Sequence, residues 1–391
     1  MTHHTPTNNH AGTTAQYDTA VSSRTIDFLR FPLCLAVIFI HTHADTVAPC
    51  TQEFSSNMVQ HFWNTIYVLL SHVATHVAVP IFFLFSGLLF FKGMDTWNGR
   101  TYISKIKRRV STLLVPFLLW NLLSFLLVCR PEFMTNMHNN SLAYAIQQVF
   151  SRFSWHIFVD ATTWGHEMVN WLGMHIPSTG PILIPLWFLR DLIAVSLIAP
   201  IIYLLVKKGN FLALFILLLA YVSKIWPLIP GFGIVAVFYF SLGSFLSIHH
   251  KGLSFLVCKR MYTITAMWLV LLVADVYYGA TMTLTGQLIH PWFVLTGVVF
   301  TISCAYNYQS THPIRTPHVL SASSFFVYAL HPIPLSLHHA YIYDRLPLSN
   351  EWAKGVTYIL TPFVTAALCV GCYVVLKRCA PRLCSLLSGN R

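Results

Sequence analysis

The chain has 391 residues, of which 55% are hydrophobic and only 9% carry a charge. A soluble domain usually has about 25% charged residues, so this composition excludes a soluble globular protein and indicates a polytopic membrane protein. The formal net charge is +12, but the basic residues form short clusters between apolar runs. Such clusters are typical of loops that face the cytoplasm and anionic lipid, and we expect no nucleic-acid partner.

Apolar runs long enough for membrane helices recur through the whole chain, and they predict an all-α protein with about ten transmembrane helices. The runs are 27–44, 63–91, 111–129, 185–206, 211–226, 231–248, 261–278, 290–306, 319–337 and 355–376. The polar segment 1–23 is expected to be a flexible cytoplasmic tail. Residues 24–378 then form the membrane domain, and 379–391 form a short basic cytoplasmic tail.

The distribution of Lys and Arg predicts the orientation. With the N-terminus in the cytoplasm, most of the 24 Lys and Arg residues lie in inner segments, as the positive-inside rule requires. We therefore predict two cytoplasmic termini and an even number of helices. The longest connection, about 130–184, then lies outside and carries several Trp residues, among them Trp155 and Trp164. It either covers a site or is an interfacial segment with an aromatic anchor.

The first apolar run carries two ionisable side chains, Arg30 and His41, which are eleven residues apart. On a helix this spacing places them on nearly the same face, with a rise of roughly 16 Å between them. Ionisable groups at membrane depth are costly and are functional candidates by default. His41 is a candidate general base; alternatively, it bonds to a neighbouring helix. Arg30 holds an anion at the mouth of a site, or it pairs with Asp27 as an interfacial anchor.

Other ionisable groups lie at a similar depth. At 1.5 Å per residue, both His41 and His331 are roughly 18–21 Å from the inner membrane edge. The prolines after His331 break its helix and free carbonyls that can bond the imidazole. Arg190 and Asp191 lie near the outer start of the fourth run, as part of a site or as a structural ion pair. All four groups converge if their three helices are neighbours.

A basic cluster with Lys105, Arg108 and Arg109 opens the third run from the cytoplasmic side. It is a positive-inside determinant, or it forms a phosphate clamp together with Arg30. His72 and His76 have the spacing of a metal-binding pair on a helix, but no third ligand is evident nearby. We expect no metal.

Taken together, these residues resemble the acyltransferase-3 family of integral membrane acyltransferases over about 22–376. The spacing of Arg30 and His41 matches the family's signature. The other stretches that carry the resemblance are 79–87 (Val-Pro-Ile-Phe-Phe-Leu-Phe-Ser-Gly), 105–109 with 116–121, 185–191, and 328–332.

The resemblance implies acyl transfer, usually of acetyl, from cytoplasmic acetyl-CoA to a carbohydrate hydroxyl. Typical acceptors are surface polysaccharides and lipid-linked glycans, and the expected location is the plasma (inner) membrane. The family's essential Arg and His fall on Arg30 and His41, and its basic loop falls on Lys105, Arg108 and Arg109. The acyl-CoA is a donor and not a permanently bound cofactor. Since the chain ends at Arg391, we expect a stand-alone membrane unit without a C-terminal extracytoplasmic domain.

On this hypothesis His41 deprotonates the acceptor, His331 is a second catalytic candidate, and coenzyme A docks on Arg30 and the basic cluster. The side chains expected to position substrate or stabilise an oxyanion are Ser86, Trp187, Arg190 and Asp191. Two other classes stay open. One is a transporter or exporter of glycans or small acids, because buried ionisable groups also mark proton relays. The other is a non-catalytic subunit of an envelope-glycan assembly complex. The sequence predicts no oligomeric state.

Overall fold

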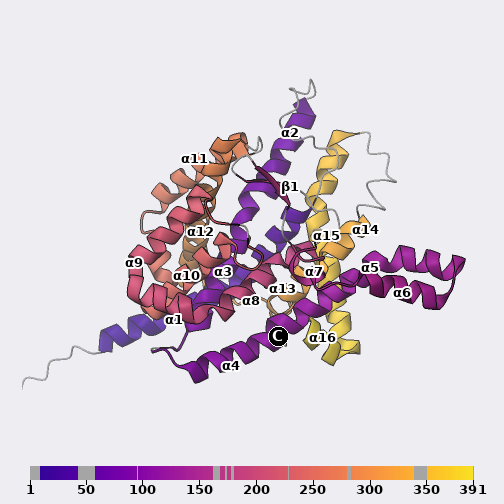
Figure 1. Cartoon of the computed structure of the whole chain (residues 1–391). Coiled ribbons are helices and arrows are strands. Elements are labelled where there is room, and N and C mark those ends of the chain that lie inside the picture. The colour runs from indigo at the N-terminus through magenta and orange to yellow at the C-terminus, as the bar shows by residue number, and fades with distance from the viewer. Residues whose placement is uncertain are drawn as a thin grey trace, which may run out of the picture.

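The computed structural model is a bundle of α-helices with one small β-hairpin (Figure 1). It describes residues 9–42, 58–94, 96–161, 168–171, 174–177, 180–227, 229–279, 283–338 and 350–390. The hairpin pairs β1 (Met168–Trp171) with β2 (Met174–Pro177) in antiparallel register.

Six helical segments in the described part of the chain are long and apolar enough to cross a membrane. They are Met58–Phe91, Gly99–Asn139, Ala199–Ser223, Met261–Tyr278, Leu284–Thr311 and Glu351–Cys379. Two shorter apolar helices, α10 (Ile234–Ile248) and α13 (His318–Leu330), lie among them. The prediction of a polytopic all-α membrane protein is confirmed, whereas the number of ten crossings and the cytoplasmic termini stay predictions.

Further helical elements are parts of these segments or neighbouring helices. They are α1 (Asn9–His41), α4 (Gly99–Arg109), the π-helical η3 (Val110–Leu114), α5 (Val115–Asn139), α11 (Met261–Gly279), α12 (Leu284–Thr311), α14 (Pro332–His338), α15 (Glu351–Cys379) and the short 3₁₀ segment η6 (Leu253–Leu256). Each of the ten predicted apolar runs is therefore largely helical where the structure describes it.

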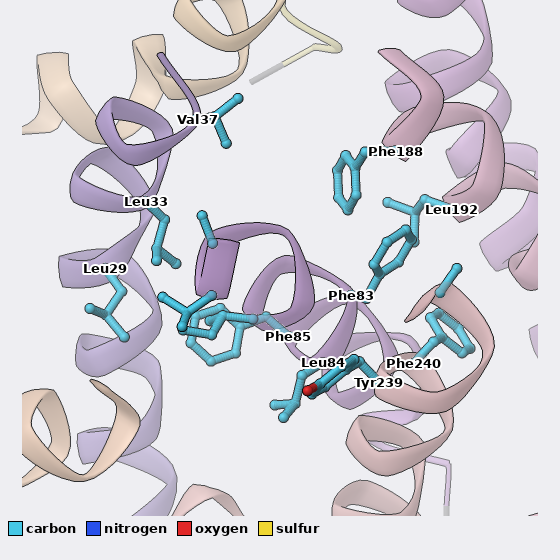
Figure 2. Close-up of a cluster of buried hydrophobic side chains, with 14 of the residues drawn as sticks. Leu29, Leu33, Val37, Phe83, Leu84, Phe85, Phe188, Leu192, Tyr239 and Phe240 are labelled. Atoms are coloured by element: carbon cyan, nitrogen blue, oxygen red, sulfur yellow. The ribbon is translucent and has the colours of Figure 1, made fainter. Parts of the chain in front are cut away.

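Helix α3 (Ala78–Phe91) lies at the centre of the core, between α1 on one side and α8 (Trp187–Leu197) and α10 on the other (Figure 2). Leu29, Leu33 and Val37 of α1 repeat every four residues, so they form one stripe that faces α3. On the other side, Phe83 of α3 packs on Phe188 of α8, with ring centroids 4.6 Å apart. The core therefore connects α1 to α8 and α10, which follow the connection 130–184.

Helices α3 and α10 cross with their backbones in contact. A Cβ atom on Gly87 would lie 2.1 Å from the carbonyl oxygen of Phe240, and one on Gly243 would lie 1.9 Å from that of Leu84. Small residues allow this close approach between membrane helices. Gly87 ends the 79–87 stretch, so the glycine of that motif has a packing role.

We expect Gly87→Ala and Gly243→Ala each to destabilise the protein by at least about 1–3 kcal/mol, the range for overpacked cores, because an added methyl group would push α3 and α10 apart. Gly371→Ala on α15 is the matched control, since a Cβ there meets no atom within 4 Å. The readouts are the melting temperature and the monodisperse fraction in detergent. A Gly87→Ala protein that melts like Gly371→Ala would contradict the close crossing.

The second apolar run is not one regular helix. After α2 (Met58–Tyr67) come the π-helical η1 (Val68–Val73) and the 3₁₀-helical η2 (Ala74–Val77), which lead into α3. Ser71 in η1 donates from Oγ to the carbonyl of Phe39 at 2.6 Å, and so satisfies a group at the end of α1. Local π-helix is frequent at functional sites, and here it changes the direction of the side chains that follow.

The fourth and fifth predicted runs meet at a break in α9 (Ala199–Ser223). Asn210 has φ 47° and ψ −129°, so it interrupts the helix between the two predicted runs. The chain enters this region through the short 3₁₀ segment η5 (Ile184–Leu186) and α8. Lys224 ends α9 in the left-handed conformation, with φ 54°.

The connection 130–184, predicted to lie outside the membrane as a long loop, is largely helical in its first half. Helix α5 extends to Asn139, ten residues past the predicted end, and α6 (Leu142–Arg152) folds back along it. An ion pair of 2.6 Å joins Arg152 to Glu132. The helical hairpin formed by the end of α5 and by α6 projects on the right of Figure 1. It is followed by α7 (His156–Val159). Trp164 lies outside the described residues.

Both predicted tails contain structure that packs on the bundle. Helix α1 begins at Asn9, and Asp18 accepts a 2.6 Å hydrogen bond from the Tyr306 hydroxyl, so 9–23 is helical and not a flexible tail. At the other end, α16 (Pro381–Leu387) packs against α5. Trp120 Nε1 donates to the carbonyl of Leu387 at 3.0 Å, so the basic C-terminal segment is held to the bundle.

Candidate active site

Two histidines predicted as catalytic candidates lie side by side. His41 is the last residue of α1, His331 follows the end of α13, and the two helices pack together. Their ring centroids are 5.4 Å apart. The sequence predicted that both rings lie at a similar depth, and their short separation agrees with that prediction.

The local backbone explains the orientation of His331. Pro332 has no N–H, so the carbonyl of Tyr328 lacks its usual helical donor. That carbonyl accepts a hydrogen bond from His331 Nδ1 at 2.6 Å, which confirms the interpretation of the proline. Since Nδ1 must carry the proton, Nε2 of a neutral His331 carries the lone pair. Nε2 is buried and has no hydrogen-bond partner within the described part of the chain.

A cavity of about 390 Å³ opens beside His41. Its wall includes Trp187 of α8, as predicted, and Tyr328 of α13, whose hydroxyl donates to the carbonyl of Pro185. The ionisable side chains in the wall are His41, His76, Lys224, His290, Tyr221 and Tyr328. The other predicted residues near this level, Ser86, Arg190, Asp191 and His331, are not among the described residues that line it.

Arg190 and Asp191 form a buried ion pair of 2.8 Å. Arg190 also donates to the carbonyl of Val159 at 2.6 Å, and Asp191 accepts from the backbone N–H of Gly233 at 3.3 Å. The pair therefore connects α8 to α7 and to the start of α10. These contacts support the structural interpretation. The pair does not line the cavity, but Asp191 accepts a hydrogen bond from Gly233, which does.

The basic residues predicted at the cytoplasmic mouth divide into two groups. Arg30 pairs with Asp27 at 2.8 Å and both side chains are well exposed; Arg108 is exposed too. Lys105 donates to the carbonyls of Phe90 and Lys92, and Arg109 donates to the carbonyl of Ser86 at 3.3 Å. Lys105 and Arg109 therefore hold α4 against the end of α3, while Arg30 and Arg108 face outward.

Two histidines of the cavity wall belong to a hydrogen-bonded series that was not among the residues predicted as the site. His76 Nδ1 lies 3.2 Å from His290 Nε2, and His290 Nδ1 lies 2.7 Å from Asp275 Oδ2. One signal was available, because Asp275 is the only charged residue in the run 261–278. His76 turns toward His290, while the His72 ring packs on Tyr67. Within the described residues no group of three or more His, Cys, Asp or Glu side chains could hold a metal.

Comparisons with known proteins agree with this architecture. The family model described as an acyltransferase domain matches residues 24–377. The chain is 27% identical over 382 residues to the succinoglycan biosynthesis protein ExoH of Rhizobium meliloti (strain 1021), an alignment that covers 96% of this chain and 94% of that protein. No solved structure shows a significant match. The chain belongs to the acyltransferase-3 family of membrane acyltransferases.

Proposed function

We propose that this membrane acyltransferase moves an acyl group, acetyl in the first instance, from cytoplasmic acetyl-CoA to a hydroxyl of a cell-envelope carbohydrate. Membership of the family supports acyl transfer. The relative's name, a succinoglycan biosynthesis protein, supports a polysaccharide or its lipid-linked precursor as acceptor. The proposed location is the plasma membrane, where the donor and an envelope acceptor can reach one protein from opposite faces.

The observation that carries the proposal is the position of His41, on the wall of a cavity inside the membrane domain. A neutral imidazole can take the proton of an acceptor hydroxyl as the oxygen attacks the thioester carbonyl. The carbon–sulfur bond then breaks and the thiolate of coenzyme A leaves. Trp187 and Tyr328 in the wall limit the access of water to the thioester.

The donor side lies below His41 along α1. Arg30 is roughly 16 Å away at 1.5 Å per residue, a span that an extended pantetheine arm can cover. Arg30 and Arg108 expose their guanidinium groups, which can bind the phosphates of coenzyme A by charge-assisted hydrogen bonds. Lys105 and Arg109 support the donor site indirectly, because they hold α4, which carries Arg108, against the end of α3.

The experiment that tests the function is release of free coenzyme A by purified protein in detergent, with acetyl-CoA as donor and a panel of envelope oligosaccharides as acceptors. We expect release that depends on an acceptor, and acylated sugar in equal amount. Folded protein that neither binds nor turns over acetyl-CoA would overturn the proposal. Glycan flux in proteoliposomes without any acyl donor would then favour the transporter.

Replacing Arg30 by Ala should raise the KM for acetyl-CoA by about 10–100-fold, the equivalent of a charge-assisted hydrogen bond of about 1.5–3 kcal/mol, with little change in kcat. Initial rates over a range of donor concentrations measure both constants. Asp27→Asn is the matched control, because it releases Arg30 from its ion pair and should lower or preserve the KM. A KM unchanged by Arg30→Ala would remove this residue from the donor site.

A further inference from the structure

Three side chains from separate elements form the hydrogen-bonded series His76, His290 and Asp275, here called the relay. His76 comes from η2, His290 from α12 and Asp275 from α11. His76 and His290 line the same cavity as His41, whereas the Asp275 side chain is completely buried behind them. The relay therefore connects the cavity to a buried carboxylate, and the function proposed above uses none of its members.

The burial of Asp275 requires a positive partner. An isolated carboxylate inside a membrane protein is costly, and such groups pair with one another or with cations. His290 contacts one carboxylate oxygen at 2.7 Å. The other oxygen, Oδ1, is buried and has no hydrogen-bond partner within the described residues. The negative charge of Asp275 is balanced when one of the two imidazoles is protonated. The relay as a whole is then neutral.

The ring contacts identify the atom through which this proton leaves. His290 uses Nδ1 toward Asp275 and Nε2 toward His76, and His76 uses Nδ1 toward His290. Whether the added proton resides on His290 or on His76, the ring nitrogen left for exchange with the cavity is His76 Nε2. When the added proton starts on His290, its departure through His76 Nε2 is matched by transfer of a proton from His290 Nε2 to His76 Nδ1. When it starts on His76, no such transfer is needed, and both imidazoles end neutral in either case.

We propose that His76 is a second catalytic residue, the proton donor to the departing sulfur, and that His290 and Asp275 are positioning residues, which orient His76 and resupply its proton. This inference rests on the proposed acyl transfer from a thioester. A thiolate formed inside a cavity of low polarity is costly, so protonation in place favours cleavage of the carbon–sulfur bond.

The step balances without a further reactant. The acceptor O–H bond breaks and its proton passes to His41, while the oxygen bonds to the carbonyl carbon. The carbon–sulfur bond breaks, its electron pair stays on sulfur, and sulfur takes the proton from His76 Nε2. The proton on His41 then returns to the relay through the shared cavity. The net transfer is one proton from the hydroxyl to the thiol.

The test compares two small acetyl donors, the thioester of N-acetylcysteamine, which has an alkyl thiol like pantetheine, and that of thiophenol, whose thiolate leaves without protonation. We expect His76→Gln to slow transfer from the alkyl thioester and from acetyl-CoA by about 10²-fold or more, the lower range for acid–base catalysis. Transfer from the aryl thioester should fall much less. His290→Gln and Asp275→Asn should show the same selectivity.

His72→Gln is the control, because His72 lies in the same segment but is exposed and packs on Tyr67; it should change neither rate. Equal losses with both donors would overturn the proposal, since a structural role for the relay would not distinguish leaving groups. If Asp275→Asn does not fold, the comparison of the two thioesters with His76→Gln, at a half-buried position in the cavity wall, decides the proposal. Absence of acetyl transfer in the wild type would refute the proposed function itself. That result differs from both a selective loss with the alkyl thioester and an equal loss with both donors.

Discussion

His41→Ala is expected to lower acyl transfer by at least about 10²–10⁴-fold, the range for loss of an acid–base group, while the protein stays folded. The imidazole lies at the end of α1 and faces a cavity, so its removal enlarges a space that already exists. The centroid of the neighbouring His331 ring is 5.4 Å away, but His331 does not line the cavity, so it is not placed to replace His41 there. Release of coenzyme A, followed with a thiol reagent, measures the effect.

The control for this variant is His312→Ala. His312 directly follows the C-terminal end of α12, is exposed and stacks on Tyr308, so its loss should leave transfer unchanged. Both proteins should elute as one peak from a sizing column and melt within a few degrees of the wild type. A folded His41→Ala protein with normal acetyl transfer would end the assignment of His41 as the base.

The features that could be predicted from the sequence depend on local geometry. The apolar runs, the common depth of His41 and His331, and the carbonyl that Pro332 leaves free all follow from the helical rise and from the missing proline N–H. Each needs only residues close together in the sequence. The distance between the two histidine rings also required α1 and α13 to be neighbours, which the sequence does not specify.

The features that were not predicted depend on contacts between helices. The π-helical break at 68–73 leaves the apolar pattern of its run unchanged, so periodicity does not reveal it, yet it turns His76 toward His290. The relay joins His76 of η2 to His290 of α12, which lies 214 positions further along the chain. The prediction of a long outer loop was wrong for a related reason, since α5 and α6 stabilise each other by packing along their length.

Removing Asp191 should unfold much of the protein, although this residue does not line the cavity. Asp191→Ala leaves Arg190 buried without its partner and removes the acceptor for the Gly233 N–H at the start of α10. Breaking a buried ion pair by deleting one partner typically costs about 3–5 kcal/mol. We therefore expect a large loss of melting temperature and of monodisperse protein in detergent.

The chain supplies its own comparison for this prediction. Asp27 and Arg30 form an ion pair of the same length, 2.8 Å, but their side chains are 48% and 38% exposed, against 3% and 10% for Asp191 and Arg190. Exposed pairs contribute about 0–1 kcal/mol, so Asp27→Ala should melt close to the wild type. Replacing both buried partners, as in Arg190→Met with Asp191→Leu, should recover part of the loss, since no charge is then left unpaired. Equal melting temperatures for Asp27→Ala and Asp191→Ala would show that the buried pair does not hold α8 in place, and the pair would again be a candidate for a direct part in acyl transfer.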